Sequence, residues 1–541
     1  MLSAREDDDS PGLMYLERSW SWRDVVRESL IRARSALALR SDGPFHVGVL
    51  LDNVPENLFW LGGAALAGAV VVGINPTRRG EELARDIRFT ECQVLVTDQK
   101  GADLIVGLDT GVEPSRVVRV DNPTRPPGAG PLRGELPEVS PQDLLLLLFT
   151  SGTTGAPKAV RCTQGRLAAI GGRASEIYGF ARDEVCYCPM PLFHGNAIMA
   201  LWSPALHVGA CIALGGRFSA SRFVDDVRRY RATRFTYVGK ALAYVLATPA
   251  RPDDSETSLR LGFGTEASAR DREQFQERFG CSLVEGYGSS EGGLAITRTA
   301  ETPPDALGLA GDGVAILDPE TGAECAPARI DPAGRLLNPD DAIGELACRS
   351  GVLAFEGYYK NPDADASRVN EGWYWTGDLA YRDPAGFVYF AGRNDDWLRV
   401  DSENFAAAPV ERILGRHPDV VAAAVYPVPD PQSADQVMAA VELRAGTSPA
   451  AFCESLTRFL SGQPDLGTKW APRLVRIVEA LPLTATGKIT KAGLRRDRWS
   501  VDDPVIWNPE RTSIGYRAFT GADADQMIAE FERHGRTNLL V

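Results

Sequence analysis

The chain has 541 residues, 44% apolar and 24% charged, which suits two or more folded domains with large cores. Its 58 Lys and Arg stand against 72 Asp and Glu, and the resulting net charge of −14 argues against a nucleic-acid partner. The nine cysteines include no CxxC pair, so neither a zinc ribbon nor a disulfide framework is indicated. A reducing cytoplasm is therefore the expected location.

Two features of the chain bear on membranes. Residues 1–10 are acidic, unlike the basic start of a signal peptide. The longest weakly polar run, residues 61–74, is shorter than the about 20 residues that a membrane span needs. We therefore expect no transmembrane segment, and peripheral contact with a membrane stays open.

The first part of the chain alternates short apolar runs with amphipathic stretches. Residues 46–51, 70–74 and 93–97 have the pattern of strands, and residues 57–69 and 81–89 between them have the pattern of helices. Strands that alternate with helices form a largely parallel sheet, so the predicted fold class is α/β. Ligands on such sheets bind beyond the carboxyl ends of the strands.

A change of character near Gly392 predicts a domain boundary. A strand at residues 387–390 ends in a polar break, and a compact α/β unit follows it. Its helices and strands are expected at residues 409–415, 420–426, 449–460 and 473–478. We expect an N-terminal domain at 1–391, a hinge at 392–396, a C-terminal domain at 397–500, and a tail at 501–541 that packs back on the body.

The segment from Thr150 to Lys158 has the composition of a loop that binds phosphate. After an apolar strand at 144–149 come Thr150, Ser151, Gly152, Thr153, Thr154, Gly155, Ala156, Pro157 and Lys158. Two glycines let the backbone approach an anion, the hydroxyls add donors, and the lysine adds a positive charge. The Walker A loop needs adjacent Gly and Lys, so a different nucleotide chemistry is implied. An exposed hairpin turn is the alternative.

A second motif places hydroxyls beside a carboxylate after another apolar strand. It consists of Tyr287, Gly288, Ser289, Ser290 and Glu291. With the glycine that follows, it also fits the GxSxG elbow of serine hydrolases. Only His417 and His534 follow the elbow, and neither has a strong context, so a hydrolase is the weaker alternative.

Three further positions complete the series. Asp378 lies in the turn Thr376-Gly377-Asp378, a common way to bind ribose hydroxyls, and Arg393 and Asp395 flank the domain break. Lys488 lies near the end of the second domain. Taken alone, such a lysine is typical of a solvated helix start.

The order and spacing of these motifs resemble the adenylate-forming (ANL) superfamily of acyl-CoA synthetases, luciferases and peptide-synthetase adenylation domains. Within it, the segment from Gly357 to Pro362, Leu398-Arg399 before Glu403-Asn404, and the aromatic tail most resemble the fatty-acid-transport-type and actinobacterial long-chain acyl-CoA ligases. The resemblance implies a large, multi-layer N-terminal adenylation domain that binds ATP and the acyl group, and a small mobile C-terminal domain. The implied activity is AMP-forming activation of a fatty or steroid side-chain acid by ATP with Mg²⁺, and transfer to coenzyme A. The enzyme is expected to be a monomer or homodimer.

The resemblance also implies roles for single residues. The loop from Thr150 to Lys158 would hold the β- and γ-phosphates. In the second motif, Ser290 would face the α-phosphate, and Tyr287, Gly288 and Ser289 would also bind the nucleotide. Glu291 would ligate Mg²⁺. The adenine would be bordered by Gly264, Thr265 and Glu266, and the ribose bound by Asp378 and Arg393. Asp395 would be the hinge, Lys488 would bridge the substrate oxyanion and the α-phosphate, and His194 would gate the acyl pocket.

One departure from the family opens an alternative. Relatives carry Gly where Ser402 stands, and that glycine lines the pantetheine tunnel. A non-CoA acceptor is therefore the second hypothesis, for example in ATP-dependent nitrite activation and diazotisation of an aryl amine. A non-catalytic ATP sensor would require loss of Lys488 or Glu291, and both are present. For Lys240, pairing with an acidic substrate group and simple solvation both stay open.

Overall fold

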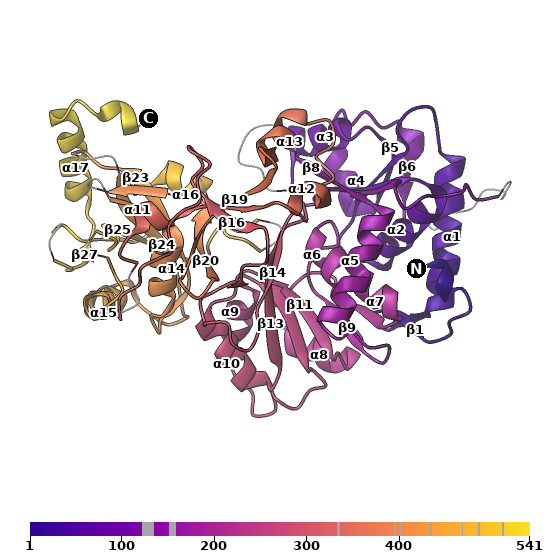
Figure 1. Cartoon of the computed structure of the whole chain (residues 1–541), viewed down its shortest axis with the longest axis horizontal. Coiled ribbons are helices and arrows are strands. Elements are labelled where there is room, and N and C mark those ends of the chain that lie inside the picture. The colour runs from indigo at the N-terminus through magenta and orange to yellow at the C-terminus, as the bar shows by residue number, and fades with distance from the viewer. Residues whose placement is uncertain are drawn as a thin grey trace.

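The computed structural model covers the chain from one end to the other (Figure 1). It describes residues 1–121, 135–150, 158–332, 336–393, 397–400, 403–432, 435–467, 469–484, 487–510 and 513–540. The N-terminal domain contains three sheets, and the C-terminal domain adds a fourth large one. Among the described helices, none is both long and apolar enough to cross a membrane.

The first large sheet confirms the predicted alternation of strands and helices. Its order is β6 (Val117–Arg119), β5 (Cys92–Thr97), β3 (His46–Leu50), β4 (Val70–Gly73), β7 (Leu144–Phe149) and β8 (Ala159–Thr163). All neighbours are parallel except β7 and β8. The crossover helices are α2 (Pro55–Ala67) and α3 (Gly80–Phe89). Helix α2 begins with Pro55 in its first turn and ends at Gly68 in the left-handed conformation, as helix-end chemistry favours.

The second large sheet carries most of the candidate site. Its order is β14 (Ala295–Thr297), β13 (Ser282–Gly288), β12 (Leu261–Thr265), β11 (Arg234–Val238), β9 (Val185–Cys188), β10 (Cys211–Leu214), β1 (Pro11–Tyr15) and β2 (Arg18–Ser21). The six strands from β13 to β1 run parallel. Helices α9 (Ala241–Leu246) and α10 (Ala269–Phe279) each follow a strand, so their first turns lie at its carboxyl end.

A third, antiparallel sheet joins the two domains. Its main order is β15 (Gly308–Leu309), β20 (Phe387–Arg393), β19 (Trp373–Arg382), β17 (Gly344–Cys348) and β16 (Val314–Leu317). Strand β20 runs directly into the predicted hinge. In Figure 1 this sheet lies between the magenta N-terminal part and the orange C-terminal domain.

The C-terminal domain is a five-stranded sheet with helices on both faces. Its order is β23 (Val420–Pro429), β24 (Asp435–Leu443), β25 (Leu474–Val478), β26 (Val505–Trp507) and β27 (Arg517–Ala518). Helices α14 (Ala407–Gly415) and α15 (Pro449–Ser461) cover one face. The predicted elements of this domain are present, and β24 is a strand that the sequence analysis missed.

The tail after residue 500 corrects one expectation. It does not form a separate segment on the body, because β26 pairs with β25 and β27 pairs with β26 in the C-terminal sheet. Helix α17 (Gly521–Arg533) buries Met527 and Phe531 against the other face of that sheet. The tail is therefore part of the core of the C-terminal domain.

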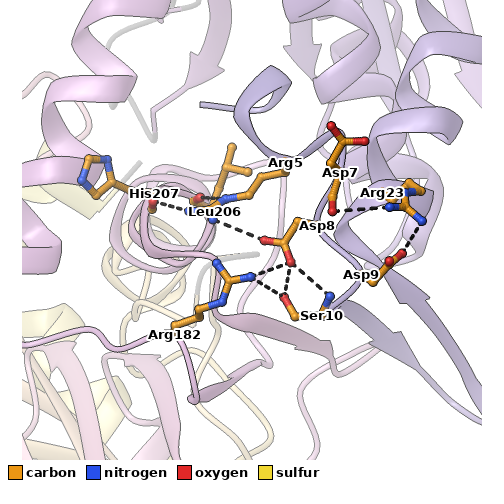
Figure 2. A network of polar contacts seen from close by, with 9 residues as sticks. All are labelled: Arg5, Asp7, Asp8, Asp9, Ser10, Arg23, Arg182, Leu206 and His207. Carbon is orange, nitrogen blue, oxygen red and sulfur yellow. Dashed lines mark hydrogen bonds and ion pairs between the residues drawn. The ribbon is translucent and has the colours of Figure 1, made fainter.

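The N-terminal residues clamp a helical segment that borders the site. This segment consists of α6 (Gly195–Ala197), the π-helical turn η3 (Ile198–Trp202) and α7 (Ser203–Val208). Arg5 donates to the carbonyls of Leu206 and His207 at the end of α7, and Asp8 accepts from both Arg5 and Arg182 (Figure 2). A cation on helix-terminal carbonyls stabilises the helix end. The chain start thereby fixes the far end of the segment that begins beside His194.

Candidate active site

The two ends of the predicted phosphate loop are held together. The Thr150 N–H donates to the Lys158 carbonyl at 3.0 Å, just beyond the pairing of Phe149 with Ala159. The Lys158 ammonium lies 5.9 Å from the centre of the Tyr358 ring. Residues 151–157, with the calls on Ser151, Gly152, Thr153, Thr154 and Gly155, lie outside the described residues. The loop thus opens at the carboxyl end of β7, where a ligand is expected.

Glu291 is a buried carboxylate beside this loop. It is 6% exposed, and its Oε1 accepts from the Tyr358 hydroxyl at 2.9 Å. Arg368 donates to the same hydroxyl through Nε at 3.2 Å. Burial and the nearby Glu291 carboxylate raise the pKa of Tyr358, so the hydroxyl keeps its proton for this bond. Tyr358 therefore links Glu291 to Lys158.

The hydroxyl motif turns away from its strand without forming a hydrolase elbow. Strand β13 ends at Gly288 and the chain returns antiparallel as β14, whereas the elbow needs a following helix. The Ser290 carbonyl accepts from Arg166 at 2.6 Å. A Cβ on Gly195 would come 2.6 Å from Ser290 Oγ, so Ser290 lies directly beside the residue that follows His194.

The two histidines after the motif do not support the hydrolase alternative. His417 is 1% exposed inside the C-terminal domain, where its Nε2 lies 3.1 Å from Ser455 Oγ. His534 follows α17 in the same domain. His417 binds Ser455 and His534 lies near Glu530, so the described residues contain no Ser-His pair at this motif.

Asp378 and Tyr287 form a second polar corner. The Tyr287 hydroxyl donates to Asp378 Oδ2 at 2.6 Å, and the backbone of Asp378 pairs with that of Arg393 across β19 and β20. The preceding Gly377 has a φ of 76°, and its N–H donates to Glu345 at 2.6 Å. Residues 376–378 are not the predicted turn but an irregular stretch inside β19, which places the Asp378 carboxylate at the end of β13, where the ribose of a nucleotide is expected.

The turn after β12 is held in a conformation that most residues avoid. Glu266 has a φ of 69°, in the left-handed region. The neighbouring Ala267 N–H donates to Glu285 Oε1 at 2.8 Å, and Glu285 also pairs with Arg272. A Cβ on Gly264 would come within 2.4 Å of the Tyr237 ring, so the strand needs glycine there. The buried Glu285 thus fixes the direction of the Glu266 side chain.

Lys488 reaches this turn from the other domain. Its Nζ lies 2.6 Å from Glu266 Oε1, and its own N–H donates to Thr484 Oγ1 at 3.1 Å. The carbonyl of Gly487 lies so close to Gly239 that a Cβ on Gly239 would be 2.8 Å away. Lys488 precedes α16 (Ala492–Asp497) and is not at a helix start. The structure therefore brings Lys488 to the carboxyl ends of β11 and β12.

His194 lies close to two cations. Burial, together with the charges of Lys488 and Arg78, lowers its pKa to about 3. The imidazole is therefore neutral at neutral pH. Arg78 is itself held by the fully buried Asp86, 3.1 Å from its Nε. Burial raises the pKa of Asp86 to about 6.

Several of these residues were missed from the sequence. Tyr358 belongs to the segment Gly357 to Pro362, which the resemblance includes without a role, and no spacing signal marks Arg78, Asp86 or Glu285. The predictions for Asp395 and Ser402 lie outside the described residues, as does the side chain of Arg393.

Lys240 follows Gly239 directly, before α9, and its side chain is partly exposed. Within the part of the chain that the structure describes, the Lys240 ammonium makes no hydrogen bond or ion pair, although the Lys240 carbonyl accepts from the Tyr244 N–H. Its position is therefore compatible both with pairing to an acidic substrate group and with simple solvation.

Solved structures share this architecture. A benzoate CoA ligase from Burkholderia xenovorans LB400 superposes with a TM-score of 0.78 at 21% identity, covering 91% of this chain and 98% of that one. The amide bond synthetase McbA from Marinactinospora thermotolerans gives 0.74 at 24% identity, with coverage of 91% and 98%. The fold is therefore that of the adenylate-forming enzymes.

Sequence comparison gives the family. The model of the AMP-binding enzyme matches residues 3–359, and that of its C-terminal domain matches residues 409–488. The chain belongs to the AMP-binding enzyme family. It is 54% identical to the steroid-22-oyl-CoA synthetase of Rhodococcus jostii (strain RHA1), over 100% of this chain and 98% of that protein. It is 44% identical to the medium/long-chain-fatty-acid–CoA ligase FadD17 of Mycobacterium marinum, over 91% and 94%.

These relatives confirm the resemblance and narrow the activity. The protein is an AMP-forming acid–CoA ligase, with ATP, a carboxylic acid and coenzyme A as its substrates. Nothing in the relatives favours nitrite activation and diazotisation.

Proposed function

We propose that the acid is carried on the side chain of a steroid. The observation that carries this proposal is the 54% identity over the whole chain to a steroid-22-oyl-CoA synthetase, against 44% for the fatty-acid ligases. Medium- and long-chain fatty acids are the second candidate class, supported by the latter relatives.

The reaction has two steps at one site. A carboxylate oxygen attacks the α-phosphorus of ATP, the bond to pyrophosphate breaks, and the acyl-adenylate forms. The thiol sulfur of coenzyme A then attacks the acyl carbon, and AMP leaves. Lys488 supports the first step because its ammonium offsets negative charge that builds up on the transferring oxygens.

The remaining residues have binding roles in this proposal. The loop flanked by Thr150 and Lys158 binds the phosphates, and Asp378 with Tyr287 binds the ribose. The turn with Glu266 borders the adenine. Neutral His194 borders the acid without adding a charge, since its pKa is lowered to about 3. For the second step, rotation about residues 392–396 withdraws Lys488, which is a conformational gate.

Glu291 fits the role of a Mg²⁺ ligand. It is a buried carboxylate, Tyr358 binds only its Oε1, and oxygen ligands suit this cation. When bound, Mg²⁺ would neutralise charge on the phosphates of ATP. The nine free cysteines further support a reducing, cytoplasmic location.

A panel of acids tests the substrate class. Purified enzyme is given ATP, Mg²⁺, coenzyme A and one acid at a time, from acetate through long fatty acids to steroids with a carboxylate at C22. Mass spectrometry then measures the thioester. We expect the highest kcat/KM with the steroid acids. A higher kcat/KM with a straight-chain fatty acid would overturn the steroid proposal in favour of the second class.

A further inference from the structure

The two domains touch at points away from the predicted hinge. Tyr244 of α9 donates its hydroxyl to Glu442 Oε2 on β24 at 3.2 Å. Arg270, in the first turn of α10, donates through Nη1 to the carbonyls of Gly415 and His417, each at 3.0 Å. Figure 1 shows α9 and α10 beside the C-terminal domain, at the edge of the N-terminal domain that faces it.

The Arg270 contact uses the chemistry of a helix end. Gly415 is the last residue of α14, and the carbonyls at a helix C-terminus are unpaired and carry partial negative charge. The Arg270 guanidinium binds the Gly415 carbonyl and complements the helix dipole, and it shares the His417 carbonyl, two residues beyond the helix, with the Val420 N–H. Because Arg270 belongs to one domain and α14 to the other, this favourable contact exists only while the domains keep this relative position.

The Tyr244 contact leads toward Lys488. Besides the Tyr244 hydroxyl, Glu442 Oε2 accepts the N–H of Leu481 at 3.2 Å. Leu481 begins the turn that carries Lys488, in which the Thr484 N–H donates to the Lys488 carbonyl. One carboxylate oxygen thus joins Tyr244 of the N-terminal domain to the base of this turn.

The active site supplies the third contact between the domains. Lys488 pairs with Glu266, which stands four residues before Arg270 in the sequence, and Gly487 packs on Gly239 just ahead of α9. The three contacts therefore all come from one stretch of the N-terminal domain, residues 239–270.

We propose that Tyr244 and Arg270 are positioning residues for Lys488. They form a clasp that holds the C-terminal domain in the pose for adenylation and that must break before the thioester step. This inference rests on the proposed role of Lys488. It predicts that loss of either side chain slows the first half-reaction and leaves the second unimpaired or faster.

The two half-reactions are measured separately in Tyr244→Phe and Arg270→Ala. ATP–pyrophosphate exchange with the best acid reports adenylation, and rapid mixing of synthetic acyl-adenylate with coenzyme A reports thioester formation. We expect exchange to fall at least about fivefold in each variant, because a hydrogen bond to a charged or dipolar partner is lost. Thioester formation should stay within about twofold of wild type or increase. Glu273→Ala, an exposed residue on the same helix, is the matched control and should change neither rate.

A double-mutant cycle adds a test of the contact itself. Tyr244→Phe and Glu442→Gln should be non-additive in the exchange rate and additive in the thioester rate. The clasp would be overturned if Tyr244→Phe and Arg270→Ala lowered the rates of both half-reactions equally, or if they left the rate of ATP–pyrophosphate exchange unchanged.

Hydrogen exchange separates this inference from the proposed function. In ligand-free enzyme, amide exchange of residues 481–490 should be faster in both clasp variants and unchanged in Glu273→Ala. Unchanged hydrogen exchange of these residues in the clasp variants would overturn the clasp, whatever the rates of the two half-reactions are. ATP–pyrophosphate exchange at the wild-type rate in Lys488→Ala would instead overturn the proposed role of Lys488. In that case the hydrogen-exchange measurement alone would test the clasp.

Discussion

Lys488 and Glu266 form an ion pair between two domains, with Nζ and Oε1 2.6 Å apart. The two side chains keep 34% and 47% of their surface exposed, so water screens the pair and its contribution to stability is small. Another anion can therefore readily replace Glu266 at the Lys488 ammonium. In the role proposed for Lys488, the carboxylate of a substrate and the α-phosphate of ATP would compete with Glu266 for the same ammonium.

Replacement of Lys488 should separate binding from chemistry. Lys488→Ala removes the ammonium that offsets the charge of the adenylation step, so we expect ATP–pyrophosphate exchange to fall about 10²- to 10³-fold. Calorimetric titration should give an unchanged Kd for ATP within about threefold. Thioester formation from synthetic acyl-adenylate is the internal control and should persist. Wild-type exchange in this variant would contradict the proposed role.

Gly239 should tolerate no side chain. It has a φ of 58°, and an added Cβ would lie 2.8 Å from the Gly487 carbonyl. Gly239→Ala should therefore push the turn of Lys488 away and lower the adenylation rate about tenfold or more, since a misplacement of about 1 Å can cost about 10²-fold. Gly172→Ala, in α5 (Gln164–Ile177) with its nearest neighbour at 3.5 Å, is the control and should retain full activity. Equal rates in both variants would show that the close approach has no catalytic consequence.

The corner formed by Asp378 and Tyr287 should control nucleotide affinity. Asp378→Asn keeps the size of the side chain but removes the charge that favours bonds from ribose hydroxyls. We expect KM for ATP to rise about tenfold with a smaller change in kcat, measured with saturating acid and coenzyme A. Tyr287→Phe removes one hydrogen bond to the same carboxylate and should give a weaker effect in the same direction. A change in KM for the acid alone would argue against a ribose site.

His194 should make the fold sensitive to acid. Its pKa is lowered from 6.5 to about 3 in the folded state, so between these values the unfolded chain binds about one more proton. The stability that depends on neutral His194 is complete above pH 6.5 and is lost as the pH falls toward 3. His194→Gln cannot titrate, so its thermal midpoint should fall less than that of wild type between pH 6.5 and pH 5. Identical acid sensitivity in the two proteins would contradict the lowered pKa.

Arg5 should stabilise the segment behind His194 from a distance. Arg5→Ala leaves two helix-terminal carbonyls and Asp8 without their shared donor (Figure 2). The expected loss is about 2 kcal/mol of stability, seen as a lower thermal midpoint, because hydrogen bonds to charged groups are worth about 1.5–3 kcal/mol. KM for the acid should rise while KM for ATP stays constant. Arg34→Ala, an exposed arginine on α1 (Trp22–Ala38), serves as the control.

The sequence predicts the fold well wherever local pattern decides it. The alternation of strands and helices around residues 46–97 agrees with the structure, because periodicity and turn residues act over short stretches. Strand β24 was missed, and the tail was assigned to the body. The position of the tail depends on the pairing of β26 with β25. These two strands are distant in sequence, so their pairing leaves no local signal in the sequence.

The site is predictable as a set of motifs but not as a geometry. Glu291, Asp378 and Lys488 are marked by their order along the chain. Tyr358, Glu285 and Asp86 act through contacts across many residues, and only the folded chain reveals that Tyr358 binds Glu291 or that Asp86 holds Arg78. The ion pair of Lys488 with Glu266 likewise depends on how two domains meet, which no stretch of sequence encodes by itself.

The construction of the tail has a practical consequence. Because α17 packs into the C-terminal sheet, the last residues travel with that domain, and the two chain ends lie on opposite sides of the molecule in Figure 1. Energy transfer between a fluorophore on each end would then report the change in distance that accompanies the proposed domain rotation between the two half-reactions. The enzyme could be timed turnover by turnover without any label near its chemistry.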